Sequence, residues 1–154
     1  MPRRSVKKDK NIYFVSRENA GLTREEASAK MEFISEDRIG RIEAGKSMPY
    51  PEEVLAMAKA YKDPLLVNHY CSGECSIGKK YVPEINEAEL SAIVLTIIDS
   101  VNGLNDRKDR LIGITADGHI TEEERPDFEK ILSYLDRVSS AAGTLKLMLE
   151  KWME

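Results

Sequence analysis

Two cysteines and a histidine lie close together near the middle of the chain. His69, Cys71 and Cys75 fall within the segment HYCSGEC. Zinc usually takes four thiolate or imidazole ligands, so one chain offers too few. A dimer that pooled two cysteine pairs could hold zinc or an iron–sulfur cluster, and oxidation could instead join the thiols in a disulfide. We interpret the cysteines as partly buried thiols of a linker and expect no metal and no other cofactor.

The segment DGHITEEE, residues 117–124, has the spacing of the second half of an EF-hand calcium loop. Gly118, Ile120 and Glu124 fall at its glycine, apolar and bidentate-acid positions. Gly113 and Thr115 stand where the first and third ligands would be, and neither carries a carboxylate. We therefore expect a turn followed by a helix cap.

No catalytic set is apparent elsewhere in the sequence. There are only two histidines, the glycines form no phosphate-binding loop, and no serine or cysteine stands beside a plausible base. We expect a protein without enzymatic activity.

The segment SEDRIGRIEAGK, residues 35–46, has the spacing of a short helix that could enter a DNA groove. Arg38, Arg41 and Lys46 suit contacts with guanine or with phosphate. Glu36 and Asp37 are unusual at such a surface because phosphates repel them. A carboxylate can accept a hydrogen bond from cytosine N4, but acids in a first helical turn also simply complement the helix dipole. Both interpretations are open.

Charge and composition favour a water-soluble protein whose N-terminal half meets any polyanion. The net charge of the 154 residues is −4, yet residues 1–63 carry 13 Lys or Arg against 11 Asp or Glu. Part of this excess lies in a basic tail, residues 1–11, which is either a solvated terminus or an arm that contacts DNA. The longest apolar run is too short to cross a bilayer, and no secretory signal follows the tail. We expect a cytoplasmic location.

Caps and breaks predict several short helices in the N-terminal half. Thr23 and Glu26 form a capping box for a helix from Arg24 to about Glu32. Ser35 caps the next helix, which ends at Gly45. Further helices are expected from Pro51 to residue 62 and over residues 65–70.

Beyond a linker at residues 71–84, the pattern changes to long helices. Apolar residues recur about every 3.5 positions in two runs, which predicts two antiparallel helices joined by a turn near Gly118. Pro126 should distort the early turns of the second helix. The expected seam is formed by Leu90, Val94, Ile97, Val101, Leu104 and Leu111, together with Phe128, Ile131, Leu135, Val138, Ala142, Leu145, Leu149 and Trp152.

Residues 12–67 resemble the helix-turn-helix domain of phage repressors and Cro, the XRE family. The resemblance rests on Gly21-Leu22-Thr23 and on Arg41-Ile42-Glu43-Ala44-Gly45-Lys46. It implies a five-helix domain in which Arg17 pairs with Glu43. It also implies DNA-facing positions at Arg24, Ser35, Glu36, Asp37, Arg38, Arg41 and Lys46. Glu36, Asp37 and Arg41 would then meet base edges, with Arg38 and Lys46 near the DNA backbone. Arg24 would face the DNA, and we expect both Arg24 and Lys46 to bind all sequences similarly through phosphate.

The sequence departs from that family in the turn and in the recognition helix. The turn Glu32-Phe33-Ile34 is one residue longer than usual and lacks its glycine. Gly40 lies inside the recognition helix and costs it about 1 kcal/mol relative to alanine.

We thus expect an all-α protein: a tail at residues 1–11, a five-helix repressor-like helix-turn-helix domain at 12–70, a linker at 71–84 and a helical hairpin at 85–154. Surplus apolar positions at Ile93, Ile98, Ile112 and Leu132 favour dimerisation through the hairpin. The expected function is a dimeric, sequence-specific transcriptional regulator that binds a palindromic operator with residues 35–44 in the major groove. The alternative is a protein-interaction module, such as a phage or plasmid accessory factor, that uses the same fold.

Overall fold

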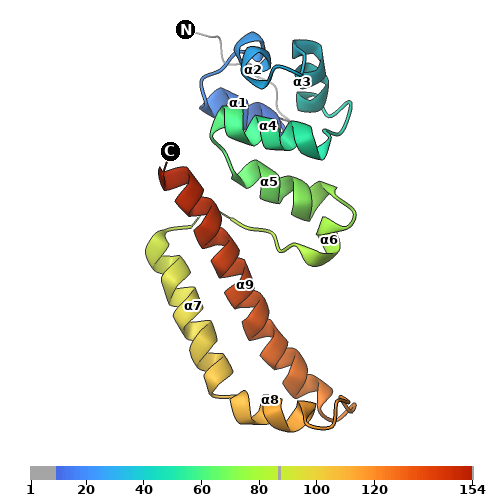
Figure 1. Ribbon diagram of the computed structural model, residues 1–154, viewed down its shortest axis with the longest axis vertical. Helices are drawn as coiled ribbons and strands as arrows, with labels where there is room; N and C mark the ends of the chain where they lie inside the picture. Colours follow the sequence, from blue (N-terminus) through green and yellow to red (C-terminus); the bar gives the residue numbers. More distant parts are fainter. Residues whose placement is uncertain (1–9, 87, 154) are drawn as a thin grey trace. The chain divides into compact units, whose positions relative to one another are not determined.

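The computed structural model describes residues 10–86 and 88–153, so most of the predicted basic tail lies outside the described residues. Every regular element in the described part is helical, which confirms the all-α fold class. The chain divides into two compact units, residues 1–84 with 151–154 and residues 85–150 (Figure 1). Each unit is considered by itself below.

Five helices share the core of the first unit: α1 (Ile12–Asn19), α2 (Arg24–Met31), α3 (Glu36–Glu43), α4 (Pro51–Tyr61) and α5 (Leu65–His69). Three of them begin at side-chain caps. The Asn11, Thr23 and Ser35 side chains accept hydrogen bonds from the backbone N–H groups three residues later. Glu26 also accepts a bond from the Thr23 N–H, which completes the predicted capping box. The helix starts predicted at Arg24, after Ser35 and at Pro51 are therefore confirmed.

A single apolar core holds these five helices together. Ile39 and Ile42 of α3 are at most 1% exposed, so one side of that helix is fixed against its neighbours. The other buried apolar side chains of this core are Tyr13, Ala27, Met31, Ile34, Val54, Met57, Ala58, Tyr61 and Leu66. Burying one such aliphatic side chain contributes about 1.5–3 kcal/mol. The opposite side of α3 is left free.

The predicted linker begins with helical turns. A π-helical turn covers Tyr70–Glu74, and α6 covers Gly78–Tyr81. A Cβ atom at Gly78 would overlap the carbonyl oxygen of Cys71, so only glycine allows this close approach. Backbone hydrogen bonds close these turns, such as that from the Cys75 N–H to the Tyr70 carbonyl.

The second unit contains α7 (Leu90–Asn105), α8 (Lys108–Thr115) and most of α9 (Arg125–Met153). Pairs of contacts show that α7 and α9 are antiparallel: Arg137 binds Asp99 at 2.8 Å, and Tyr134 lies against Gly103. The predicted hairpin is therefore present, but its first helix is broken before Leu111. Asn105 and Asp106 are poor helix formers, and α8 starts anew after them.

One further expectation for the second unit was wrong, and another holds only in part. Pro126 does not distort α9, because the helix begins at Arg125 and a first-turn N–H has no helical partner to lose. The predicted seam holds only in part. Of its members, Ile131 of α9 is 1% exposed, and Ile97 of α7 and Leu145 of α9 are half-buried, whereas Val94 and Val101 of α7 are 40% and 48% exposed. Ile93, one position before Val94, is buried instead, and Gly103 allows the ring of Tyr134 to approach closely.

The turn before α9 follows the expected pattern. Gly118 adopts a positive φ of 76°, and Asp117 accepts a hydrogen bond from the His119 N–H. Glu124 turns back to accept bonds from the backbone N–H and the hydroxyl of Thr121. Residues 117–124, which resemble half of a calcium loop in sequence, thus form a turn followed by a helix cap. The side chain of Trp152, predicted for the seam, lies outside the described residues.

Candidate nucleic-acid interface

The free side of α3 is a continuous surface. Glu36, Asp37, Arg41 and Ala44 are exposed, and Gly40 lies between them at one helical turn from Glu36 and Ala44. The turn that delivers the chain to α3 contains Glu32 with a φ of 60°, a conformation that favours glycine. Ser28 steadies this turn by donating its hydroxyl to the Ile34 carbonyl. The longer, glycine-free turn seen in the sequence is therefore accommodated by a strained glutamate.

A buried carboxylate ties α3 to the two helices before it. Glu43, whose side chain is 1% exposed, accepts bonds from Nε of Arg17 at 2.5 Å and from Nη2 of Arg17 at 3.2 Å. The ion pair that the resemblance implied is thus present in the structure. Arg24 adds a second cation, with its Nε 2.8 Å from Oε2 of Glu43. One carboxylate therefore balances two guanidinium groups, and this cluster keeps a net positive charge.

Arg38 points away from the free side of α3. Its guanidinium makes two 2.7 Å bonds to Glu53, donates to the Ser47 hydroxyl and the Met48 carbonyl, and lies over the ring of Tyr50. Burial alone would raise the pKa of Glu53, but the bonds from Arg38 and from the Tyr50 N–H outweigh it and lower that pKa. The Arg38 side chain, expected near the DNA backbone, instead fastens α3 to the start of α4.

The remaining predicted contact residues are free. Arg41 and Lys46 are both exposed, and neither side chain has an ion-pair partner among the described residues. Glu36 and Asp37 are exposed in the first turn of α3, where Ser35 serves as the cap. A free surface with one acidic end and one basic end is what the structure offers to a partner.

Comparison with known families gives one match. Residues 15–64 match the family model described as a helix-turn-helix domain. The N-terminal unit carries a helix-turn-helix domain. No curated protein and no solved structure matches the chain. In the helix-turn-helix domain, α2 and α3 are the pair for which the fold is named, and the free side of α3 is the surface that such domains present to DNA.

Sequence reasoning missed two members of this site. Glu53 was not singled out, although its position three residues after Tyr50 is that of a helix-capping acid, and it indeed accepts a bond from the Tyr50 N–H. The bond from Arg24 to Glu43 was also missed, because no local spacing signals a contact across 19 residues.

In the described part of this single chain, no group of three or more His, Cys, Asp or Glu side chains is placed to hold a metal ion, and a site shared between two chains stays untested. Cys71 and Cys75 are free, half-buried thiols of the folded linker. Nearby, Glu74 accepts a 3.0 Å bond from the Tyr13 hydroxyl, and His69 lies 3.6 Å from Glu74. Burial and the charge of Glu74 raise the pKa of Tyr13 well above its usual value.

No described helix is long and apolar enough to cross a membrane.

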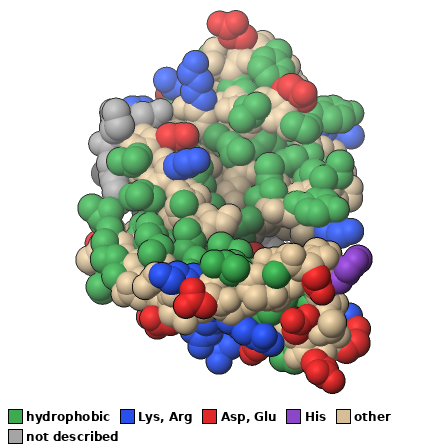
Figure 2. Space-filling model, turned by 60° about the horizontal axis from the view of Figure 1, so that its bottom comes forward, with side chains coloured by type: hydrophobic (Ala, Val, Ile, Leu, Met, Phe, Trp, Pro, Cys, Tyr) green, Lys and Arg blue, Asp and Glu red, His purple; other side chains and the backbone are tan. Residues whose placement is uncertain are grey.

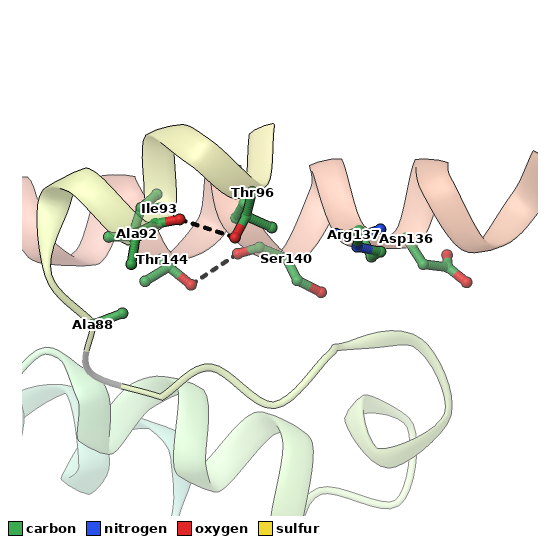
Figure 3. Close-up of a pocket in the computed structure, with 9 residues that line it drawn as sticks. Ala88, Ala92, Ile93, Thr96, Asp136, Arg137, Ser140 and Thr144 are labelled. Carbon is green, nitrogen blue, oxygen red and sulfur yellow. Dashed lines mark hydrogen bonds between the residues drawn. The ribbon is translucent and has the colours of Figure 1, made fainter. Parts of the chain in front are cut away.

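A shallow pocket of about 330 Å³ lies between α7 and α9 in the second unit (Figure 3). Its walls are mostly small side chains, and Thr96 and Thr144 donate their hydroxyls to backbone carbonyls one turn earlier in their own helices. The walls therefore offer mainly methyl contacts. The lining residues are Ala88, Ala92, Ile93, Thr96, Asp136, Arg137, Ser140, Ala141 and Thr144.

Proposed function

We propose that the protein is a dimeric, non-catalytic transcriptional regulator of the XRE type that binds a palindromic operator. The observation that carries this proposal is the construction of α3. Its inner side is anchored by Ile39, Ile42 and Glu43, while its outer side is free and belongs to a domain matched by a helix-turn-helix family model. A rigidly held helix with an unoccupied face suits insertion into the major groove.

Each residue of the free side has a distinct role in this proposal. Arg41 reads guanine, because an exposed guanidinium without a protein partner can make a bidentate contact with O6 and N7. Lys46 contacts phosphate. Ser35, Glu36 and Asp37 approach the base edges, where the two acids either accept from cytosine or limit affinity by repulsion. Arg38 acts indirectly by holding α3 in place.

Dimerisation is proposed through an aliphatic face of the hairpin. On α7 the exposed Val94 and Val101 directly follow buried residues, and on α9 Leu132 and Leu149 directly follow the buried Ile131 and Met148. Each exposed residue is one position, or about 100° around the helix, beyond a buried residue. Because α7 and α9 are antiparallel, this equal rotation brings the exposed residues of both helices onto the same face of the hairpin. Many hydrophobic side chains are visible at the surface in the view of Figure 2. A second hairpin packed on the aliphatic face would form a four-helix bundle.

The DNA-binding proposal is tested with a random duplex library and the full chain. Sequences should be enriched at low salt, and the affinity should fall steeply as salt is raised, because each neutralised phosphate releases counterions. Replacement Arg41→Gln should cost about 1–3 kcal/mol at one base pair of each half-site. Replacement of Glu36 and Asp37 by glutamine should raise general affinity, with specificity blurred only if these acids read cytosine.

The dimer is tested by sedimentation of the full chain. Val94→Lys should convert a dimer into a monomer because it places a charge in the centre of the aliphatic face. Asn102→Lys, at an exposed position of the same helix, is the matched control and should leave the dimer intact. A wild-type chain that sediments as a monomer at tens of micromolar contradicts this part of the proposal.

A protein-interaction module is the second candidate, and charge favours it. Residues 12–63 carry 8 Lys or Arg against 10 Asp or Glu, and two of the arginines are bound to Glu43. Large apolar side chains on this domain are also exposed, including Phe33, Tyr50 and Leu55. If the chain binds no duplex at low salt, with or without Glu36→Gln and Asp37→Gln, this second function is the better account.

A further inference from the structure

Gly40 is a partly buried position at the edge of the free side of α3, next to the buried Glu43, and a side chain from another helix covers it. The Nη1, Cζ and Nε atoms of Arg24 lie 3.5, 3.6 and 3.8 Å from the point where a Gly40 Cβ atom would stand. Because these three distances are nearly equal, the guanidinium lies flat against the helix. Arg24 belongs to α2, yet its charged group lies against α3 at the edge of that helix's free side.

Glu43 fixes Arg24 in this position. It accepts a bond from Nε of Arg24, so the side chain is held at its inner edge while 45% of it is exposed. Nη1 and Nη2 have no hydrogen-bond partner among the described residues and form a two-pronged donor. The same carboxylate is already balanced by Arg17, so the positive charge of Arg24 is not cancelled.

We infer that Arg24 is a second base-reading residue. Its guanidinium, which lies against Gly40, contacts guanine in the major groove. This inference rests on the proposed DNA-binding function. A fixed guanidinium with both terminal nitrogens free matches the O6 and N7 acceptors of guanine. Its place against α3, the helix proposed to enter the groove, favours a base edge over a phosphate. Glu43 and Gly40 are then positioning residues for Arg24.

The test compares enriched sequences for the full-length wild type and four variants, two at Arg24 and two at Gly40. Arg24→Lys keeps the charge but removes the two-pronged donor. Discrimination in favour of guanine at one position of each half-site should fall about 5- to 150-fold, while the salt dependence stays the same. Gly40→Leu should cause the same loss, because a leucine side chain displaces Arg24. Gly40→Ala is the matched control and should retain the preference, since a methyl group at 3.5 Å makes an ordinary contact.

The affected base pair must differ from the one that Arg41→Gln affects, and thermal unfolding must show that each variant is folded. If Arg24→Lys enriches the same sequences as the wild type, the inference is overturned, and uniform weakening by Arg24→Gln would identify a phosphate contact instead. A wild-type chain that enriches no sequence would overturn the proposed function itself, and this inference with it.

Discussion

Replacement of Glu43 by alanine should be among the most destabilising single changes in the first unit. The change leaves Arg17, whose side chain is only 7% exposed, as a buried cation without its partner. Breaking a buried pair from one side costs about 3–5 kcal/mol, because the remaining charge cannot return to water. At about 4 °C or more per kcal/mol for a domain of this size, the midpoint of thermal unfolding should fall by at least about 12 °C.

Calorimetry of the full chain gives the measurement, and two variants check its interpretation. Arg24→Ala removes a partner that is 45% exposed, so solvent screening should limit its cost to about 1 kcal/mol or less. The double replacement Arg17→Met with Glu43→Leu should recover much of the loss, because no buried charge remains. If Glu43→Ala unfolds at the temperature of the wild type, or if Arg24→Ala costs as much, burial does not determine the strength of this cluster and the reasoning is refuted.

Three smaller perturbations should also be measurable in the full chain. Glu32→Gly should raise the free energy of unfolding by about 1 kcal/mol, because glycine adopts a φ of 60° without strain; an unchanged midpoint in urea would show that the turn stores no strain. Gly40→Ala should stabilise α3 by about 0.5–1 kcal/mol by the same assay, and a loss of stability would mean that Arg24 cannot tolerate the methyl group. The pKa of Glu53 is lowered in the folded state, so its bond to Arg38 stabilises the protein above the unfolded-state pKa of about 4.5 and is lost as the pH falls below it. Glu53→Gln should therefore be less stable than the wild type at pH 6, and the difference should shrink towards pH 3; a constant difference would exclude titration of this pair.

Local signals predicted the helix-turn-helix domain well. Thr23, Glu26 and Ser35 make their capping bonds within three residues, so the sequence alone determines where α2 and α3 begin. The sequence did not predict which groups the longer side chains would bind. Arg24 and Arg38 both looked like free cations, yet each finds a carboxylate 15 or more residues away.

The hairpin shows a different limit of sequence reasoning. A heptad pattern identifies the apolar stripe of each helix but does not say which neighbour that stripe meets. Here Gly103 lies against the ring of Tyr134, although glycine is not apolar enough to mark a seam. Val94, Val101, Leu135 and Leu149 of the predicted seam are instead exposed. Small residues at close helix contacts carry little signal in a hydrophobic pattern.

The folded turns at Tyr70–Glu74 and Gly78–Tyr81 have a consequence for how two binding domains would work together. Because residues 70–81 are mostly folded into these turns, only residues 82–89 form the connecting segment between α6 and α7. Eight residues span at most about 29 Å even when fully extended. In a dimer, binding of one domain to a half-site would therefore confine the other to a small volume, at an effective concentration in the millimolar range. Half-sites about 34–36 Å apart would be favoured, and lengthening the segment by inserted glycines should relax that spacing before it weakens the binding of either domain alone.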